Sequence, residues 1–231
     1  MVNIVERVDD RVEIRRVLVS VSDKSGLDTL IPGLIEIVPQ IRFFSTGGTY
    51  RAIAEILGER LTAEHLTPVA AYTGQPETQG GLVKTLDFKI YLGLLTETHN
   101  PAHQADLART EAVPIDMVVV NLYPFEATVS QEDVTVEEAR ANIDIGGPCM
   151  LRAAAKNYLR VTPIVDPADY GPLLATLREG AGALSLTTRF GYARKAFEHT
   201  AAYDAAIVSF LRHQDPDDVR GAYPELKAAG E

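Results

Sequence analysis

Short polar segments follow several apolar runs of this 231-residue chain, and their side chains could bind an anion or move a proton. They are SVSDKSG (residues 20–26), STGGT (45–49), NLYPF (121–125) and DIGGP (144–148). In open α/β sheets, ligands bind beyond the carboxyl ends of the strands. If the apolar runs are strands of one sheet, these segments meet at one edge. Their convergence predicts a ligand site more strongly than any one segment alone.

The segment STGGT has the residue types of an anion cradle. Thr46 and Thr49 supply hydroxyls, Gly47 and Gly48 supply a flexible backbone, and a helix is expected to follow. The first amides of a helix point outward, and the helix dipole favours negative charge there. The alternative is an ordinary glycine turn with a helix cap. The spacing matches neither a P-loop nor a dinucleotide-binding fingerprint.

Two lysines lie close to these segments in the sequence. Lys24 could act as a phosphate counter-charge, or Ser22 or Asp23 caps a helix and Lys24 is solvated. Lys84 and Thr85 stand at the end of a glycine-rich loop, where a lysine beside a hydroxyl suits contact with an oxyanion or a phosphate. A solvated loop lysine is the alternative at position 84.

Three further residues are candidates for proton transfer. Tyr123, with Asn121 before it, ends an apolar run and could donate a hydrogen bond or relay a proton, or it packs over the sheet edge. Asp144 precedes an expected helix and is a candidate base or an N-terminal cap. Lys156 lies in the last turn of that helix, where it could also complement the helix dipole.

The elements that must position these residues alternate between strands and helices. Apolar and β-branched runs predict strands at residues 17–21, 41–44, 88–95, 115–122 and 161–165. Helical spacing is found at residues 27–38, 50–57 with a stop at Gly58, 102–109, 134–143, 148–157, 168–177 and 187–213 with a break near Gly191. Residues 67–81 form a long polar stretch. The alternation predicts an α/β fold with a mainly parallel sheet flanked by helices, and the helix-rich final third packs against it.

Composition excludes several classes of protein. A formal net charge of −10 argues against a general nucleic-acid binder, although a few lysines can still form a local phosphate pocket. The single cysteine, Cys149, excludes an internal disulfide framework and a four-cysteine zinc site, and we interpret it as a buried packing residue. No apolar run is long enough to span a bilayer, and the charged N-terminus is unlike a signal peptide. We therefore expect a cytoplasmic protein without a membrane or nucleic-acid partner.

Six longer motifs together resemble one family. They are SVSDKSGL, FSTGGTYRAIAE, YTGQPETQGGLVKTL, IDMVVVNLYPFEATV, NIDIGGPCMLRAAAKN and TRFGYARKAFEHTAAYDAAI, in this order. They closely resemble the IMP cyclohydrolase domain, which forms the N-terminal part of a bifunctional purine-biosynthesis enzyme. The resemblance implies a methylglyoxal synthase-like fold. We expect a lead-in at residues 1–15, one domain at residues 16–213 and a polar tail at residues 214–231.

The resemblance implies closure of the ring of 5-formamidoimidazole-4-carboxamide ribonucleotide, with loss of water, to give IMP. The carboxamide nitrogen attacks the formyl carbon, so the enzyme must hold the substrate, accept a proton and stabilise an oxyanion. No metal or organic cofactor is implied. The resemblance also implies a homodimer and a transformylase as the partner activity. In this family the transformylase is a second domain of the same chain, and here it could be a separate protein.

The resemblance assigns roles to the motif residues. The cradle for the 5′-phosphate and ribose would comprise Ser22, Asp23, Lys24, Thr46, Gly47, Gly48 and Thr49. Lys84 and Thr85 would approach the reacting groups. Asn121 and Tyr123, with Leu122 between them, would orient the base and assist proton transfer, and Asp144, Ile145 and Gly146 would contact the heterocycle. Lys156 is the main candidate for acid–base catalysis or oxyanion stabilisation.

One loop departs from the family pattern. Where the family reads GRVKTLHP, this chain reads GLVKTLDF, so Leu82 replaces an arginine, and Asp87 and Phe88 replace histidine and proline. Lys89 is the nearest substitute for the lost charge. The altered loop motivates one alternative, a non-catalytic nucleotide-binding or regulatory module on the same fold. A methylglyoxal synthase-like lyase acting on a triose phosphate is a third reading, which NLYPF and AAAKN disfavour because they suit a nucleotide-sized ligand. The charged end of the chain favours a stand-alone cyclohydrolase over a trimmed one.

Overall fold

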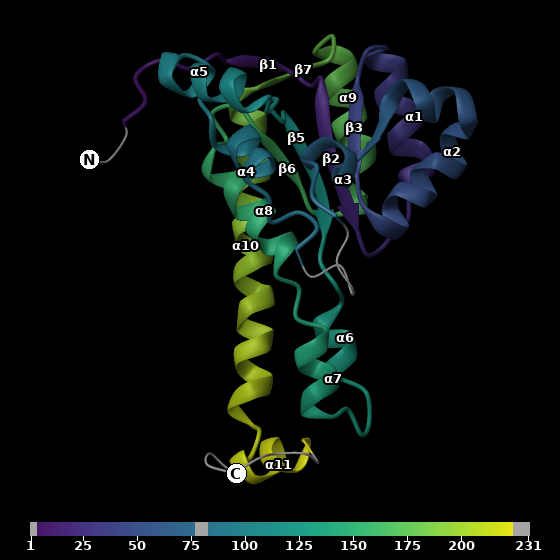
Figure 1. The fold of residues 1–231 in the computed structure, drawn as a ribbon, viewed down its shortest axis with the longest axis vertical. Coiled ribbons are helices and arrows are strands. Elements are labelled where there is room, and N and C mark those ends of the chain that lie inside the picture. Colours follow the sequence, from purple (N-terminus) through teal and green to yellow (C-terminus); the bar gives the residue numbers. More distant parts are fainter. Residues whose placement is uncertain (1–3, 77–82, 224–231) are drawn as a thin grey trace.

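A five-stranded parallel sheet forms the centre of the protein (Figure 1). The computed structural model describes residues 4–76 and 83–223. The strand order is β4-β3-β2-β5-β6, and each neighbouring pair is parallel. The strands are β2 (Arg16–Val21), β3 (Arg42–Ser45), β4 (Leu66–Pro68), β5 (Met117–Asn121) and β6 (Thr162–Ile164). This arrangement confirms the predicted α/β fold with a mainly parallel sheet.

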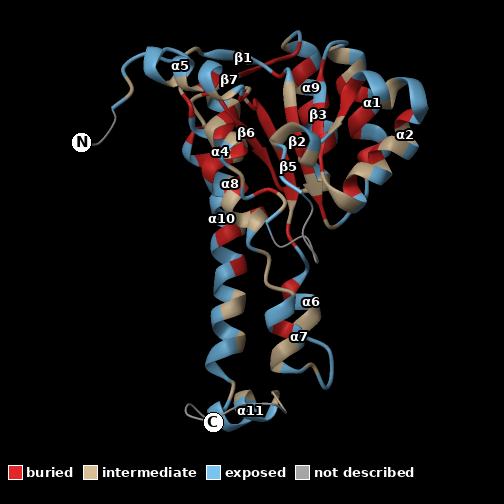
Figure 2. Ribbon diagram, viewed as in Figure 1, coloured by how far each residue is buried: buried red, intermediate tan, exposed pale blue. Residues whose placement is uncertain are grey.

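Helices cover both faces of the sheet (Figure 1). Side chains alternate along a strand, so Val17 and Val19 of β2 pack toward one face and Leu18 toward the other. The first face is covered by α1 (Leu27–Ile37), α2 (Gly47–His65) and α9 (Tyr170–Glu179), and the second by α4 (Phe88–Leu95), α8 (Gly146–Lys156) and α10 (Leu186–Arg212). Buried residues are concentrated on the strands and on the inner sides of these helices (Figure 2). Burial on both faces explains why the strands read as continuous apolar runs.

The final third packs on the sheet through α10, which lies along α8 and β6. The second half of α10 extends past the sheet beside α6 (Phe125–Val129) and α7 (Val136–Ala141), and most of this extension is exposed (Figures 1 and 2). The predicted break near Gly191 is wrong, because α10 is continuous from Leu186 to Arg212. No helix in the described part of the chain has the length and apolar character to cross a membrane.

The remaining elements are short. They are β1 (Arg11–Glu13), α3 (Val69–Thr73), α5 (Pro101–Thr110), the 3₁₀ turn η2 (Pro167–Asp169), β7 (Ala183–Ser185) and α11 (Pro216–Gly221). β1 and β7 pair antiparallel as a separate two-stranded sheet. The fully buried Arg189 of α10 donates to the carbonyls of Asp9 and Asp10, which attaches the start of the chain to the domain.

Residues 88–95, predicted as a strand, form helix α4. Ile90, Gly93 and Leu94 are its buried residues, at helical spacing, and Asp87 caps its first turn by accepting from the Lys89 amide at 2.7 Å. Gly93 lies against the Val113 carbonyl, which leaves no room for a Cβ. A short apolar run does not by itself distinguish a buried helix from a strand, which is why the prediction failed.

Two further segments can be compared with their predictions. The polar stretch predicted at residues 67–81 contains the end of β4 (Leu66–Pro68) and α3 (Val69–Thr73), which the sequence did not indicate. The stop predicted at Gly58 is present, because its φ of 67° and ψ of 173° are not helical, and a second helical segment of α2 follows to His65. Glycine tolerates this positive φ.

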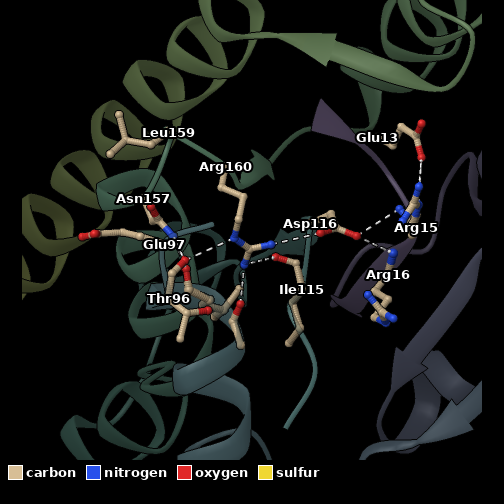
Figure 3. A network of polar contacts seen from close by, with 12 residues as sticks. Glu13, Arg15, Arg16, Thr96, Glu97, Ile115, Asp116, Asn157, Leu159 and Arg160 are labelled. Carbon is tan, nitrogen blue, oxygen red and sulfur yellow. Dashed lines mark hydrogen bonds and ion pairs between the residues drawn. The ribbon is translucent and has the colours of Figure 1, made fainter. Parts of the chain in front are cut away.

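A buried polar network lies at the amino ends of β2 and β5 (Figure 3). The Asp116 carboxylate accepts from the backbone amides of Arg15 and Arg16 and pairs with Arg160 at 3.0 Å. Arg160 also donates to the carbonyls of Thr96, Gly93 and Ile115. Each of these contacts joins backbone segments distant in sequence, so the network fixes the amino edge of the sheet.

Candidate active site

A cavity of about 520 Å³ opens at the opposite, carboxyl edge of the sheet. Its walls come from the segments after β2, β3 and β5 and from the start of α8, as the sequence predicts. The predicted residues that line it are Ser22, Lys24, Thr46, Gly47, Gly48, Thr49, Lys84, Thr85, Asn121, Tyr123, Asp144, Ile145 and Gly146. The volume is within the range of small-molecule sites.

The first turn of α2 forms one end of the cavity. Thr46 is the N-cap, and its side chain makes no capping hydrogen bond. The amides that open the helix are therefore left for another acceptor. The Lys84 Nζ lies 3.2 Å from the point where a Cβ on Gly47 would sit, and the Lys24 Nζ lies 3.9 Å from the same point on Gly48. Two ammonium groups thus stand beside a helix N-terminus, which favours an anion.

The capping alternative for the segment after β2 is wrong. Helix α1 begins at Leu27 with Gly26 as its N-cap and no side-chain cap. Asp23 instead accepts from the amide and hydroxyl of Ser25, which lowers the pKa of its carboxyl. Lys24 turns back to donate to the Ser22 carbonyl at 3.2 Å and remains exposed.

Arg51 is a third cation near this end, and the sequence analysis missed it. Its Nη2 lies 4.0 Å from the position that a Cβ on Gly48 would occupy. Within the described residues, no hydrogen bond or ion pair engages its side chain. The signal was available in the helical spacing, since Arg51 is three residues after Gly48 and falls on the same helix face.

Asn121 holds the turn after β2. Its Oδ1 accepts from the amides of Ser22 at 2.6 Å and Asp23 at 2.9 Å, and its Nδ2 donates to the Asp23 carbonyl at 2.8 Å. Thr49 similarly bonds both the amide and the carbonyl of Val21. These side chains position the wall of the cavity, a role that sequence spacing did not indicate.

The first turn of α8 forms the other end of the cavity. Ile145 is the N-cap of α8, and the Asp144 Oδ1 accepts from the Gly147 amide at 2.9 Å, so this carboxylate bonds the first turn of the helix and lines the cavity at once. A Cβ on Gly147 would lie 2.5 Å from Asp144 Oδ2 and 2.6 Å from the buried Leu122 side chain. Burial raises the pKa of Asp144, and amide donors of Gly147, Tyr123 and Gly146 oppose that shift. A half-buried carboxyl of this kind suits general base catalysis.

The loop of residues 83–86 joins the two ends. Lys84 reaches the start of α2, and the Oγ1 of the next residue, Thr85, lies 2.7 Å from the Cβ point of Gly146 at the start of α8. Thr85 is buried, whereas Tyr123 and Ile145 are more than half exposed at the mouth of the cavity. The cavity thus lies between two helix N-termini, and one dipeptide contacts both.

The MGS-like domain model matches residues 29–149, which include most of the cavity wall. The chain belongs to the MGS-like domain family. A second model, described as the AICARFT/IMPCHase bienzyme, matches residues 154–229. The two matches meet within α8.

Curated relatives of this MGS-like domain are named "Bifunctional purine biosynthesis protein PurH". The protein from Magnetococcus marinus is 48% identical over 213 residues, or 92% of this chain and 38% of the relative. The protein from Bacillus subtilis is 47% identical over 198 residues, or 86% of this chain and 37% of the relative. The chain thus spans about two fifths of the length of these relatives. A solved structure titled "Crystal structure of ForH" aligns with a TM-score of 0.70 and 32% identity, covering 85% of this chain and 98% of that chain.

Three predicted site residues, Asp23, Leu122 and Lys156, do not line the cavity of this MGS-like domain, and Lys156 lies at the far end of its helix from it. Lys156 is exposed in the last turn of α8, whereas the cavity lies at the first turn. Ten helical steps of about 1.5 Å separate Gly146 from Lys156 by roughly 15 Å along the axis. Its catalytic role stays a prediction from the resemblance, and its position suits the dipole alternative.

The residues that depart from the family pattern make other contacts than the sequence predicts. Leu82 lies outside the described residues. Asp87 caps α4. The Lys89 ammonium donates to the Tyr72 carbonyl at 3.5 Å and lies 5.7 Å from the centre of the Tyr72 ring. Neither residue lines the cavity, so Lys89 does not replace the lost arginine there.

Proposed function

We propose that this chain is an IMP cyclohydrolase, which closes the ring of 5-formamidoimidazole-4-carboxamide ribonucleotide to give IMP and water. One observation carries the proposal: Lys84 and Thr85 link the two helix N-termini, which places an anion cradle and the Asp144 carboxylate in one cavity. The purine-biosynthesis names of the relatives and the bienzyme model support the same reaction.

In the proposed complex, the 5′-phosphate binds the amides at the start of α2, with Lys24 beside it. Because the cavity extends from the start of α2 to the start of α8, the heterocycle then lies toward the start of α8. The side chains of Tyr123 and Ile145 stand at the mouth, where their apolar surfaces suit contact with a planar ring. Holding the carboxamide against the formyl group supplies the proximity that cyclisation needs.

The chemistry needs one base and one oxyanion contact. The carboxamide nitrogen attacks the formyl carbon and loses a proton to Asp144, while the formyl oxygen takes up negative charge. The Lys84 ammonium and the Thr85 hydroxyl stabilise that oxygen. Protonation of the oxygen and loss of a second nitrogen proton then release water and leave the C=N bond of IMP. All proton transfers are internal, so the reaction is balanced without a co-reactant.

The test is turnover by the full chain. The formylated ribonucleotide is mixed with the protein, and IMP formation is followed by ultraviolet absorbance and confirmed by chromatography. We expect catalytic turnover that saturates with substrate. Binding of IMP without turnover would replace the proposal with the nucleotide-binding module, and formation of methylglyoxal from a triose phosphate would replace it with the lyase.

A further inference from the structure

Tyr203 of α10 contacts the segment that carries Asp144, although 59 residues separate them. The Asp144 amide donates to the Tyr203 hydroxyl at 2.8 Å, and that hydroxyl donates to the Asn142 carbonyl at 3.3 Å. The two bonds bracket Ile143, so they fix the backbone immediately before the carboxylate. Tyr203 is buried and does not line the cavity.

The Tyr203 side chain also contacts Phe125, which follows the cavity segment of Asn121 and Tyr123. The Tyr203 ring packs edge-on against Phe125 with ring centroids 6.1 Å apart, and Phe125 packs in the same way on Phe210 at 6.0 Å. The fully buried Phe125 directly follows the segment of Asn121 and Tyr123, and its amide donates to the Tyr123 carbonyl at 2.8 Å. Tyr203 therefore contacts one wall of the cavity directly, at Asn142 and Asp144, and the other through Phe125.

We propose that Tyr203 is a positioning residue of this site, which sets the direction of the Asp144 carboxylate through the Asp144 backbone. The inference rests on the proposed function, because it gives Asp144 the role of base. A base must lie within hydrogen-bond reach of the proton it accepts, and small displacements cost rate. The Tyr203 hydroxyl accepts from the Asp144 amide and donates to the Asn142 carbonyl. Without these two bonds, the segment would be free to move.

The neighbours of Asp144 define what the test must separate. Its carboxylate accepts from the Gly147 amide, and Tyr91 of α4 and Cys149 of α8 are titratable groups nearby. Burial raises the pKa of Tyr91 well above its usual range and also raises the pKa of Tyr203, so both phenols stay neutral near neutral pH. No cation forms an ion pair with Asp144 within the described ranges. Its titration therefore depends mainly on burial and on the amide donors.

The experiment compares Tyr203→Phe with Tyr192→Phe. The first keeps the ring contact with Phe125 and removes the hydroxyl. The second removes a hydroxyl from the same helix, away from the cavity. We expect Tyr203→Phe to lower kcat about tenfold and to leave KM within about twofold, since the phosphate cradle is untouched. The acidic limb of kcat should move to higher pH, because a displaced Asp144 loses amide donors that favour its charged form. Tyr192→Phe should match the wild type.

Two activity-independent measurements separate this inference from the proposed function. The Asp144 carboxyl is titrated by ¹³C NMR in both variants, and hydrogen exchange of the Asp144 amide is measured in the wild type. We expect a higher pKa of Asp144 in Tyr203→Phe and slow exchange of the wild-type amide. Unchanged kcat and titration, or an amide that exchanges at the rate of a free peptide, would overturn the role of Tyr203. A wild type without turnover overturns the proposed function, while these two measurements still decide the placement.

Discussion

The two ends of the central strands each carry an acidic and a basic residue, but for different purposes. At the amino edge, Asp116 and Arg160 are buried and bond each other and several backbone groups. At the carboxyl edge, Asp144 and Lys84 line an open cavity. No ion pair forms for either residue within the described part of the chain.

The difference shows how hydrogen bonding separates a structural network from a reactive site. Arg160 gives its donors to Asp116 and to carbonyls, so it has little left for a ligand. At the cavity, Asn121 bonds the turn after β2 and the Tyr203 hydroxyl bonds the Asp144 segment, so Asp144 and Lys84 are positioned without pairing with each other or with another charge in the described residues. A charge that is already paired stabilises the fold, and a charge that is held but unpaired can act on a substrate.

The largest effect is expected from Asp144→Asn. The amide cannot accept the substrate proton, so kcat should fall by about 10² to 10⁴ while IMP binding is kept. Because burial raises the pKa of Asp144 and the ionised form is the base, wild-type turnover should also fall as pH drops through that pKa. Steady-state kinetics across pH check both. Asp166→Asn is the matched control, since Asp166 is already paired with Lys195 at 2.9 Å, and equal losses in both variants would contradict the role of Asp144.

The next effect is on stability at the opposite edge. Arg160→Met leaves Asp116 buried without its cation, which should cost about 3–5 kcal/mol of unfolding free energy. Urea unfolding measures it. Arg178→Met breaks a surface ion pair with Glu36 and should cost about 1 kcal/mol or less. If the two variants unfold at the same urea concentration, the buried network does not hold the amino edge.

A smaller effect is expected on nucleotide binding. Lys24→Gln removes one ammonium beside the start of α2, so KM should rise about tenfold with kcat nearly constant. The difference should shrink at high salt, because screening weakens the lost attraction. Lys89→Gln is the control, since its side chain lies on Tyr72 outside the cavity. A rise in KM for Lys89→Gln alone would show that the altered loop supplies the phosphate contact.

The smallest effect is expected from Asp87→Ala. Loss of the cap of α4 should reduce stability by about 1 kcal/mol, and Asp87→Asn should retain most of it because asparagine also caps. Turnover should stay near the wild-type value in both. A marked gain in activity in Asp87→Ala would mean that this carboxylate opposes Lys84 in the cavity.

The sequence predicts those parts of the site that can be recognised within single segments of the chain. The polar segments after β2, β3 and β5 converge as expected because parallel strands place their carboxyl ends together. One motif contains both Asp144 and Lys156, but Lys156 is the last of the eleven residues of α8, so the motif does not bring the two side chains to one site. The Tyr203 contact crosses 59 residues and leaves no periodic signal, so only the folded chain reveals it.

A crystal structure of the full chain with IMP bound tests the central claim most directly, namely that the carboxyl-edge cavity is the nucleotide site. We predict the phosphate on the amides of Gly47 and Gly48, with Lys24 beside it, and the purine ring facing Asp144. A larger cleft of about 890 Å³ lies at the amino edge, lined by Arg16 and Arg42 among others. IMP in that cleft, with the carboxyl-edge cavity empty, would contradict the account.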